Sequence, residues 1–155
     1  MIDQTEIRRK IVAEARTWLG TPYHLNSRIK GVGCDCATLI LQTMINVGVF
    51  TEERMEIYSD DWWQHTEEEK YSMVVLRHAK KILETVCYRS VKALPGQIVL
   101  GRVNGTGRLN HGAIITEFPM AIHSVAPVAV EVNLSTDPMW AYHPIEIYDP
   151  LKLEE

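Results

Sequence analysis

One segment limits the possible folds of this chain more than any other. Eight of the twelve residues from Cys36 to Val47 are apolar. A helix with apolar residues around most of its circumference must be largely buried, because little of its surface is suited to water. Gly48 would end this helix, and Asp35 just before it is a residue type that caps a helix N-terminus through its side-chain oxygens. Other elements of the chain must therefore surround this helix.

The segments before and after the apolar run differ in periodicity. From Thr5 to Leu19, apolar residues recur at three- and four-residue spacing, which predicts an amphipathic helix. After Pro95 and Gly96 the sequence changes to short β-type runs separated by turn residues. The predicted strands are residues 97–103, 111–117, 120–125, 128–134 and 145–148. Helices followed by strands predict an α+β fold, with N-terminal helices packed on a meandering antiparallel sheet.

The length of the chain suits a single domain over residues 1–155, with a sizeable core. Residues 51–92 are expected to form a helical insert between the apolar run and the first of these strands. Within it, Thr66 and Glu69 give a capping-box pattern, which predicts a helix running towards Thr85.

Composition excludes some partners and locations. The net charge is −4 and the pI is near 5.9, so the chain offers no basic stripe for nucleic-acid phosphates. Charges near the N-terminus argue against a signal peptide, and no stretch reaches the roughly 20 apolar residues that span a bilayer. We therefore expect no nucleic-acid partner, no membrane insertion and a cytoplasmic location on synthesis.

Cys36, at the start of the buried helix, is a candidate nucleophile. Unpaired N–H groups and the positive end of the helix dipole stabilise a thiolate, so we expect this thiol to be more acidic and more reactive than usual. His111 and His123 lie far downstream and are candidates for the base and for the group that orients it. These two histidines must come from paired strands, joined by a turn near residues 117–119.

The same residue types also raise the possibility of a zinc site, formed by Cys34, Cys36, His111 and His123. The C-x-C spacing lacks the usual two-residue gap, and the spacing of the histidines matches no recognised zinc pattern. We therefore expect neither a metal ion nor another cofactor. Cys87 makes the number of cysteines odd, which fits a disulfide framework poorly and leaves at least one thiol free.

Further segments flank these candidates. They are GTPYHLN (20–26), DCATL (35–39), LPGQIVL (94–100), NHGAII (110–115) and AIHSV (121–125). In this order they resemble the NlpC/p60 family of cell-wall cysteine peptidases, which implies a papain-like fold. The resemblance implies that Cys36 is the nucleophile, that His111 is the base and that His123 is the third member of the triad.

The resemblance also suggests how substrate is held. It implies that the Tyr23 hydroxyl takes part in oxyanion or substrate binding. Asp35 is a second candidate for this binding, although its position favours a helix cap. Ala37-Thr38 and Gln97 depart from the family pattern, which usually has Ser-Gly and Asp there. These departures leave the shape of the substrate groove open.

The insert points to one branch of the family. The stretch from Cys36 to His111 is longer than is common in secreted members, and it contains an Asp-Trp segment at residues 60–63. This longer form resembles the phage and prophage members. It implies a tail-associated or virion-associated protein, with phage tail proteins as possible partners, that reaches the cell wall by that route.

The implied activity is hydrolysis of the amide bond between D-glutamate and the diamino acid in peptidoglycan stem peptides. Two alternatives stay open. In the first, the chain is a catalytically inactive tail or assembly subunit that uses the groove for binding; in the second, it is an amidase or acyltransferase acting on another small substrate. Thioester chemistry at Cys36 is common to all of the enzymatic interpretations.

Overall fold

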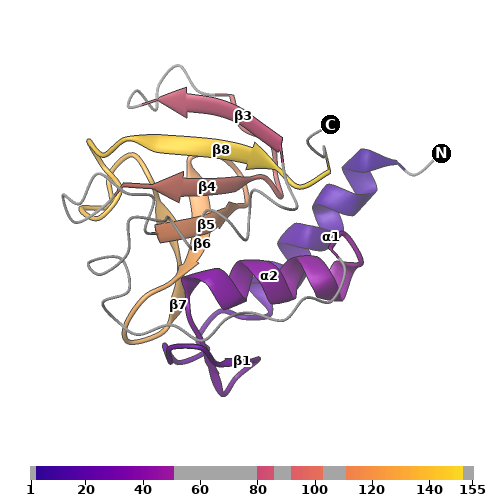
Figure 1. Cartoon of the computed structure of the whole chain (residues 1–155), viewed down its shortest axis with the longest axis vertical. Coiled ribbons are helices and arrows are strands. Elements are labelled where there is room, and N and C mark those ends of the chain that lie inside the picture. The colour runs from indigo at the N-terminus through magenta and orange to yellow at the C-terminus, as the bar shows by residue number, and fades with distance from the viewer. Residues whose placement is uncertain (1–2, 51–79, 86–91, 103–110, 152–155) are drawn as a thin grey trace.

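The computed structural model describes residues 3–50, 80–85, 92–102 and 111–151. In this part of the chain, two α-helices pack against one antiparallel sheet, as Figure 1 shows. The helices are α1 (Gln4–Arg16) and α2 (Cys36–Val47), and a short hairpin of β1 (Arg28–Ile29) and β2 (Gly33–Cys34) lies between them in the sequence. The α+β prediction is confirmed.

Within the described residues, the main sheet has six strands in the order β3-β8-β4-β5-β6-β7. Their bounds are β3 (Lys80–Thr85), β4 (Ile98–Gly101), β5 (His111–Ile115), β6 (Met120–Ser124), β7 (Ala129–Asn133) and β8 (Ile145–Asp149). Strands β4 to β7 form the predicted meander, and β8 returns to pair with the free side of β4. All five strands predicted after Pro95 are present.

The central strands are buried on both faces. In β4, Ile98 and Leu100 belong to the core beneath the helices, whereas Val99 belongs to a second core on the opposite face. Trp140 fills part of this second core from the segment after β7. The strands therefore read as continuous apolar runs, without the alternation of a half-exposed sheet.

Helix α2 is buried as its composition requires. Its buried residues are Ala37, Thr38, Leu39, Ile40, Leu41, Thr43 and Met44. Asp35 accepts hydrogen bonds from the N–H groups of Ala37 (3.0 Å) and Thr38 (2.9 Å), and the Thr38 hydroxyl accepts one from the Asp35 N–H (2.8 Å). Gly48 ends the helix with a φ of 87°, a left-handed conformation that favours glycine. Both predicted caps are confirmed.

Gln97 takes part in a buried polar network that holds α1 to the sheet. Arg8 forms an ion pair with Asp149 (Nη2 to Oδ2, 2.7 Å), and Gln97 Nε2 donates to the same Asp149 oxygen (3.1 Å). The Gln97 side-chain oxygen also accepts from the Leu94 N–H (2.9 Å). An aspartate at position 97 could not donate to Asp149, and it would bring a second carboxylate towards the first.

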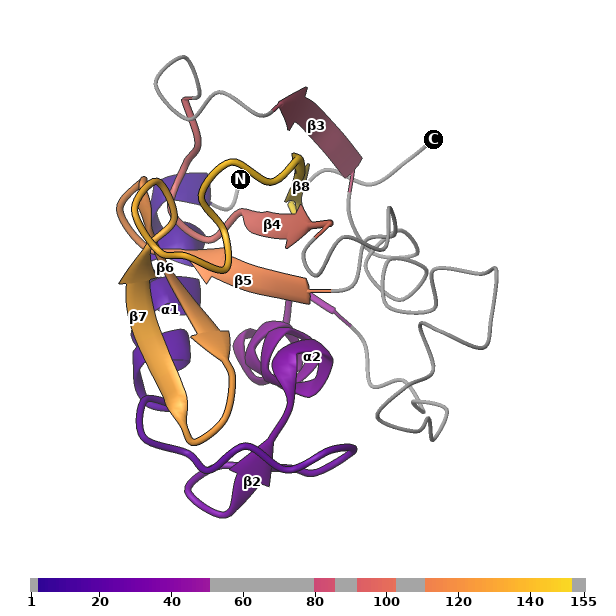
Figure 2. The same cartoon turned by 90° about the vertical axis from the view of Figure 1, so that its left-hand side faces the viewer.

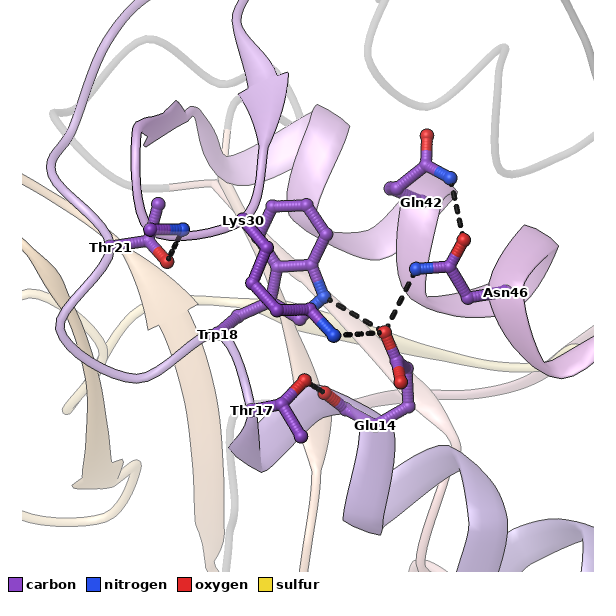
Figure 3. Close-up of polar contacts among 8 residues, drawn as sticks. Glu14, Thr17, Trp18, Thr21, Lys30, Gln42 and Asn46 are labelled. Atoms are coloured by element: carbon purple, nitrogen blue, oxygen red, sulfur yellow. Dashed lines mark hydrogen bonds and ion pairs between the residues drawn. The ribbon is translucent and has the colours of Figure 1, made fainter.

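A second network joins α1, the β1–β2 hairpin and α2, and Figure 3 shows it. Glu14 Oε1 accepts hydrogen bonds from Lys30 Nζ (2.8 Å), Asn46 Nδ2 (2.8 Å) and Trp18 Nε1 (3.3 Å). Burial alone would raise the pKa of Glu14, but these donors and the charge of Lys30 lower it overall. Glu14 therefore carries its charge at neutral pH and anchors three elements.

One helix prediction is wrong at its C-terminal end. The predicted helix was to run towards Thr85, but Lys80–Thr85 forms strand β3, which pairs antiparallel with β8. This pairing joins residues far apart in sequence, and a local capping pattern carries no information about it. Residues 51–79, which include Thr66, Glu69 and the Asp-Trp segment, lie outside the described residues.

No described helix is both long and apolar enough to cross a membrane.

Candidate active site

The candidate site lies where β5 and β6 separate. These strands pair at Ile114–Ile122 and Ile115–Ala121, and their ladder stops there. The pairing of β4 with β5 continues to His111, and the pairing of β6 with β7 continues to Ser124. Figure 2 shows β5 and β6 diverging, with α2 beside them. The N-terminal end of α2 can therefore meet backbone groups that a continuous ladder would have occupied.

Cys36 is the first residue of α2 and is partly buried. Its sulfur accepts a hydrogen bond from the backbone N–H of Gly112 in β5 and is also close to the N–H groups of Cys36 and Ala37. Gly112 directly follows His111, so this contact places the thiol beside the strand end that carries the predicted base. The structure thus brings together two segments that are far apart in sequence.

The predicted acidity of the thiol is wrong in direction. Burial and the nearby Asp35 carboxylate raise the pKa of Cys36 to about 12, although the Gly112, Ala37 and Cys36 N–H groups lower it. The helix N-terminus is present as expected, but removal of the sulfur from water outweighs it. In the resting protein the thiol is therefore protonated at neutral pH, and a neighbouring base must take its proton before it can attack.

His111 and His123 form a direct pair, as the sequence predicted. His111 opens β5 and His123 lies in β6, and the turn at residues 116–119 connects the two strands. His111 Nε2 and His123 Nδ1 are 2.8 Å apart, and both side chains are buried. The ring centroids are 5.0 Å apart in an edge-to-face arrangement. This pairing leaves the other nitrogen of His111, Nδ1, as its candidate proton acceptor.

Both imidazoles are neutral in the resting site. Burial and the neighbouring His123 lower the pKa of His111 to about 3. Burial also lowers the pKa of His123, although the Asp137 carboxylate opposes this shift. With both groups neutral, the thiol proton can pass to the imidazole as the sulfur attacks, so no thiolate has to be present in the resting site.

Trp140 belongs to this site, although no sequence pattern indicated it. Its indole Nε1 donates to His123 Nδ1 (3.1 Å), and its ring packs against the rings of His111 and His123 at centroid distances of 5.2 and 6.0 Å. The indole is fully buried. The available signal was that a buried tryptophan N–H usually finds an acceptor, but nothing in the sequence indicated which one.

Asp35 and Tyr23 are the two residues predicted to bind the substrate or the oxyanion. Both oxygens of the buried Asp35 carboxylate accept backbone hydrogen bonds, Oδ1 from the first turn of α2 and Oδ2 from the Asn26 N–H (2.8 Å). Its capping role accounts for these contacts, and a role in substrate binding stays a prediction. Tyr23 is partly exposed, and its backbone forms a bridge to Cys34, two residues before the nucleophile. Its predicted role towards an oxyanion also stays a prediction.

Cys34 helps to hold together the strands around the site. Its buried thiol donates to the Ser124 hydroxyl (3.5 Å), which in turn donates to the Cys34 carbonyl (3.0 Å). These bonds join β2 to β6 next to His123. Within the described ranges, no group of three or more His, Cys, Asp or Glu side chains is arranged to hold a metal ion.

Comparison with solved structures shows which fold the chain has. It matches the NlpC/p60 domain of the peptidoglycan hydrolase SagA with a TM-score of 0.57 and 18% identity, covering 90% of this chain and 97% of that one. It also matches NlpC1 from Trichomonas vaginalis (TM-score 0.62, 18% identity, 96% of this chain and 45% of that one). The chain therefore has the papain-like α+β fold of NlpC/p60 domains and spans less than half the length of the Trichomonas protein.

A third match is an N-acetylmuramoyl-L-alanine amidase from Bacteroides uniformis, with a TM-score of 0.51 and 13% identity over 92% of this chain and 98% of that one. No protein-family model matches the sequence, and the search of curated proteins found no match. The identities are low, so these matches define the fold, and the chemistry must be argued from the site.

Proposed function

We propose that this protein is a cysteine peptidase of the NlpC/p60 type that hydrolyses amide bonds in peptidoglycan stem peptides. The observation that carries the proposal is the position of Cys36: it opens a buried helix, and its sulfur contacts the Gly112 N–H beside the His111–His123 pair. This arrangement supplies a nucleophile, a base and a group that orients the base. The similarity in fold to a peptidoglycan hydrolase supports the choice of substrate.

The site's residues would act in a fixed order. His111 Nδ1 takes the proton of the Cys36 thiol as the sulfur attacks the amide carbonyl carbon. The carbonyl oxygen becomes an oxyanion, for which N–H groups at the α2 N-terminus and the Tyr23 hydroxyl are the candidate donors. His111 then gives its proton to the leaving amine as the C–N bond breaks, and a thioester remains. Water, deprotonated by His111, cleaves the thioester and restores the thiol.

The finer assignments rest on the resemblance in sequence. It supports cleavage between D-glutamate and the diamino acid of the stem peptide. The length of the 51–92 insert supports a phage or prophage origin and an association with a phage tail that delivers the protein to the cell wall.

The test uses purified stem-peptide fragments and the Cys36→Ala variant, with mass spectrometry of the products. We expect wild-type protein to release two fragments whose masses identify the broken bond, and Cys36→Ala to release none. Cys34→Ser is the matched control, since it replaces a thiol two residues away but keeps a donor for the Ser124 hydroxyl, and it should retain the activity. Undiminished cleavage by Cys36→Ala would refute the thiol mechanism.

A second enzymatic function has a specific observation in its favour. The amidase from Bacteroides uniformis shares this fold. An N-acetylmuramoyl-L-alanine amidase leaves the stem peptide intact and separates it from the sugar. Intact peptides released from glycan-linked substrate would therefore assign this activity, whereas divided peptides would assign the endopeptidase.

A further inference from the structure

The contact between Trp140 and His123 determines where the protons lie in the site. The indole N–H can only donate a hydrogen bond. Since it points at His123 Nδ1 (3.1 Å), that nitrogen must be the unprotonated one. The neutral His123 ring therefore carries its proton on Nε2.

The protonation of His111 follows from that of His123. Its Nε2 lies 2.8 Å from His123 Nδ1, which has just been identified as an acceptor. His111 Nε2 must then be a second donor, which shares the single lone pair of His123 Nδ1 with the indole, and it must carry a proton. A neutral imidazole has only one N–H, so His111 Nδ1 keeps its lone pair. That lone pair is what a base for the Cys36 thiol requires.

We propose that Trp140 is a positioning residue that fixes the tautomers of both histidines and thereby keeps His111 Nδ1 available as the proton acceptor. The proposal rests on the proposed function in one respect, that His111 is the base for Cys36. Trp140 does not touch the reacting atoms in this scheme. It acts through His123, and His123 acts through His111.

Without the indole donor, the pair has a second arrangement of similar geometry. His123 could carry its proton on Nδ1 and donate it to His111 Nε2. His111 would then carry its own proton on Nδ1 and present a donor to the thiol in place of a lone pair. This reversed pair is a stable neutral state that cannot accept the thiol proton. Its population lowers the fraction of molecules that are ready to react.

The surroundings of the pair keep both imidazoles neutral, so each ring must carry its single proton on one nitrogen or the other. Burial lowers the pKa of both histidines, so neither ring is held as a doubly protonated cation near neutral pH. The charged group that acts on His123 is Asp137, whose backbone carbonyl accepts the N–H groups of Trp140 (3.0 Å) and Ala141 (2.8 Å). This turn fixes the position of the buried indole. Trp140 is therefore held rigidly enough to select one tautomer.

The first test reads the protons directly. Nitrogen-15 NMR shifts of the imidazole rings near pH 7 distinguish protonated from unprotonated nitrogens. We expect wild-type protein to show His123 and His111 both protonated on Nε2, and Trp140→Phe to show a substantial population with Nδ1 protonated. Trp18→Phe is the matched control, because it removes another buried indole N–H, one that donates to Glu14. A wild-type spectrum with His123 protonated on Nδ1 would overturn the proposal without any variant.

The second test measures alkylation of Cys36 by iodoacetamide across pH, with mass spectrometry to separate this thiol from the other cysteines. We expect Trp140→Phe to react about tenfold more slowly than wild type near pH 7, the worth of one hydrogen bond. The ratio of the two rates should shrink as the pH rises towards the Cys36 pKa of about 12, because a growing share of the thiol then ionises without help from His111. Trp18→Phe should follow the wild-type profile.

A double-mutant cycle separates positioning from packing. In a His123→Ala background, Trp140→Phe should change the alkylation rate by less than about twofold, because the residue through which Trp140 acts is gone. An equal loss in both backgrounds would show that the indole only supports the fold, and it would overturn the proposal. Neither NMR nor alkylation needs a substrate, so both results hold whether or not the protein cleaves peptidoglycan.

Discussion

Two buried tryptophans in this protein donate their indole N–H groups to very different acceptors. Trp18 donates to the Glu14 carboxylate (3.3 Å), which also accepts hydrogen bonds from Lys30 and Asn46. Trp140 donates to a neutral imidazole nitrogen of His123 (3.1 Å), and this nitrogen also accepts a hydrogen bond from His111. The first cluster is charged and joins structural elements near the surface, whereas the second is buried, neutral and next to a candidate nucleophile.

The difference lies in what each acceptor can tolerate. A carboxylate has several lone pairs and a fixed charge, so the loss of one donor leaves its ionisation and its other bonds in place. An imidazole nitrogen has one lone pair and can exchange its role with the other ring nitrogen. The same indole donor is therefore replaceable at Glu14 but decides the position of protons at His123. Changes in the two clusters should differ accordingly.

The largest effect is expected from removal of the base. His111→Ala leaves the Cys36 thiol, with its pKa raised to about 12, without a proton acceptor. We expect kcat/KM on the stem-peptide substrate to fall about a thousandfold, within the usual range for the loss of a general base. Glu14→Gln, the change in the other cluster, should leave kcat/KM unchanged within about twofold. Comparable losses in both variants would show that activity reports overall folding and not the chemistry of the site.

A smaller activity loss is expected at His123. In His123→Asn, the amide oxygen has two lone pairs and can accept from both His111 Nε2 and the Trp140 indole, so the base stays oriented. We expect kcat/KM to fall about tenfold, and the pH profile should keep its shape. A loss as large as that of His111→Ala would mean that His123 takes part in proton transfer itself, and the order of the triad would need revision.

The same histidine pair should make folding stability depend on pH. Burial lowers the pKa of His111 from 6.5 to about 3, so between these values the unfolded chain binds a proton that the folded protein excludes. Stability is therefore fully present above pH 6.5 and is lost as the pH falls through that window. From pH 7 to pH 5 the loss should be about 2 kcal/mol, since each unit of pKa difference is worth about 1.4 kcal/mol.

Urea unfolding of wild type and His111→Gln at pH 5 and pH 7 measures this term. The glutamine cannot titrate. The free energy of unfolding of wild type, relative to that of His111→Gln, should therefore fall by about 2 kcal/mol from pH 7 to pH 5. The lowered pKa values of Glu14 and Asp149 act at more acid pH and in both proteins, and they cancel in this difference. An unchanged difference would show that His111 is accessible to protons in the folded state.

Sequence alone could predict the parts of this site that depend on local patterns. The apolar run predicted a buried helix with Cys36 at its start, Asp35 predicted its cap, and β-type runs placed His111 and His123 on neighbouring strands. Each of these rests on residues near one another in the chain. The parts that sequence could not give depend on contacts between distant segments.

Three such contacts were missed or misread. Trp140 reaches His123 from the loop beyond β7, where no periodic pattern leads to it. Burial against β5 reverses the pKa shift that the helix N-terminus alone would give Cys36. Strand β3 exists because β8 offers it an edge to pair with, at residues 145–149. In each case the deciding partner lies well outside the window that a local pattern covers.

The smallest effect should come from the charge of Glu14. Glu14→Gln keeps the shape of the cluster but removes its ion pair with Lys30 (2.8 Å), which is partly exposed, so stability at pH 7 should fall by about 0.5 kcal/mol. Because the pKa of Glu14 is lowered in the folded protein, this contribution is present above the unfolded pKa and is lost as the pH falls through the folded one. Urea unfolding at pH 7 and at successively lower pH should therefore find a difference in stability between variant and wild type that is full at pH 7 and shrinks as the pH falls, and high salt should reduce it. A loss of stability of several kcal/mol would mean that the Glu14 charge itself holds α1 to α2. The two clusters would then differ in their exposure to solvent, and not in how the acceptor responds to the loss of one donor.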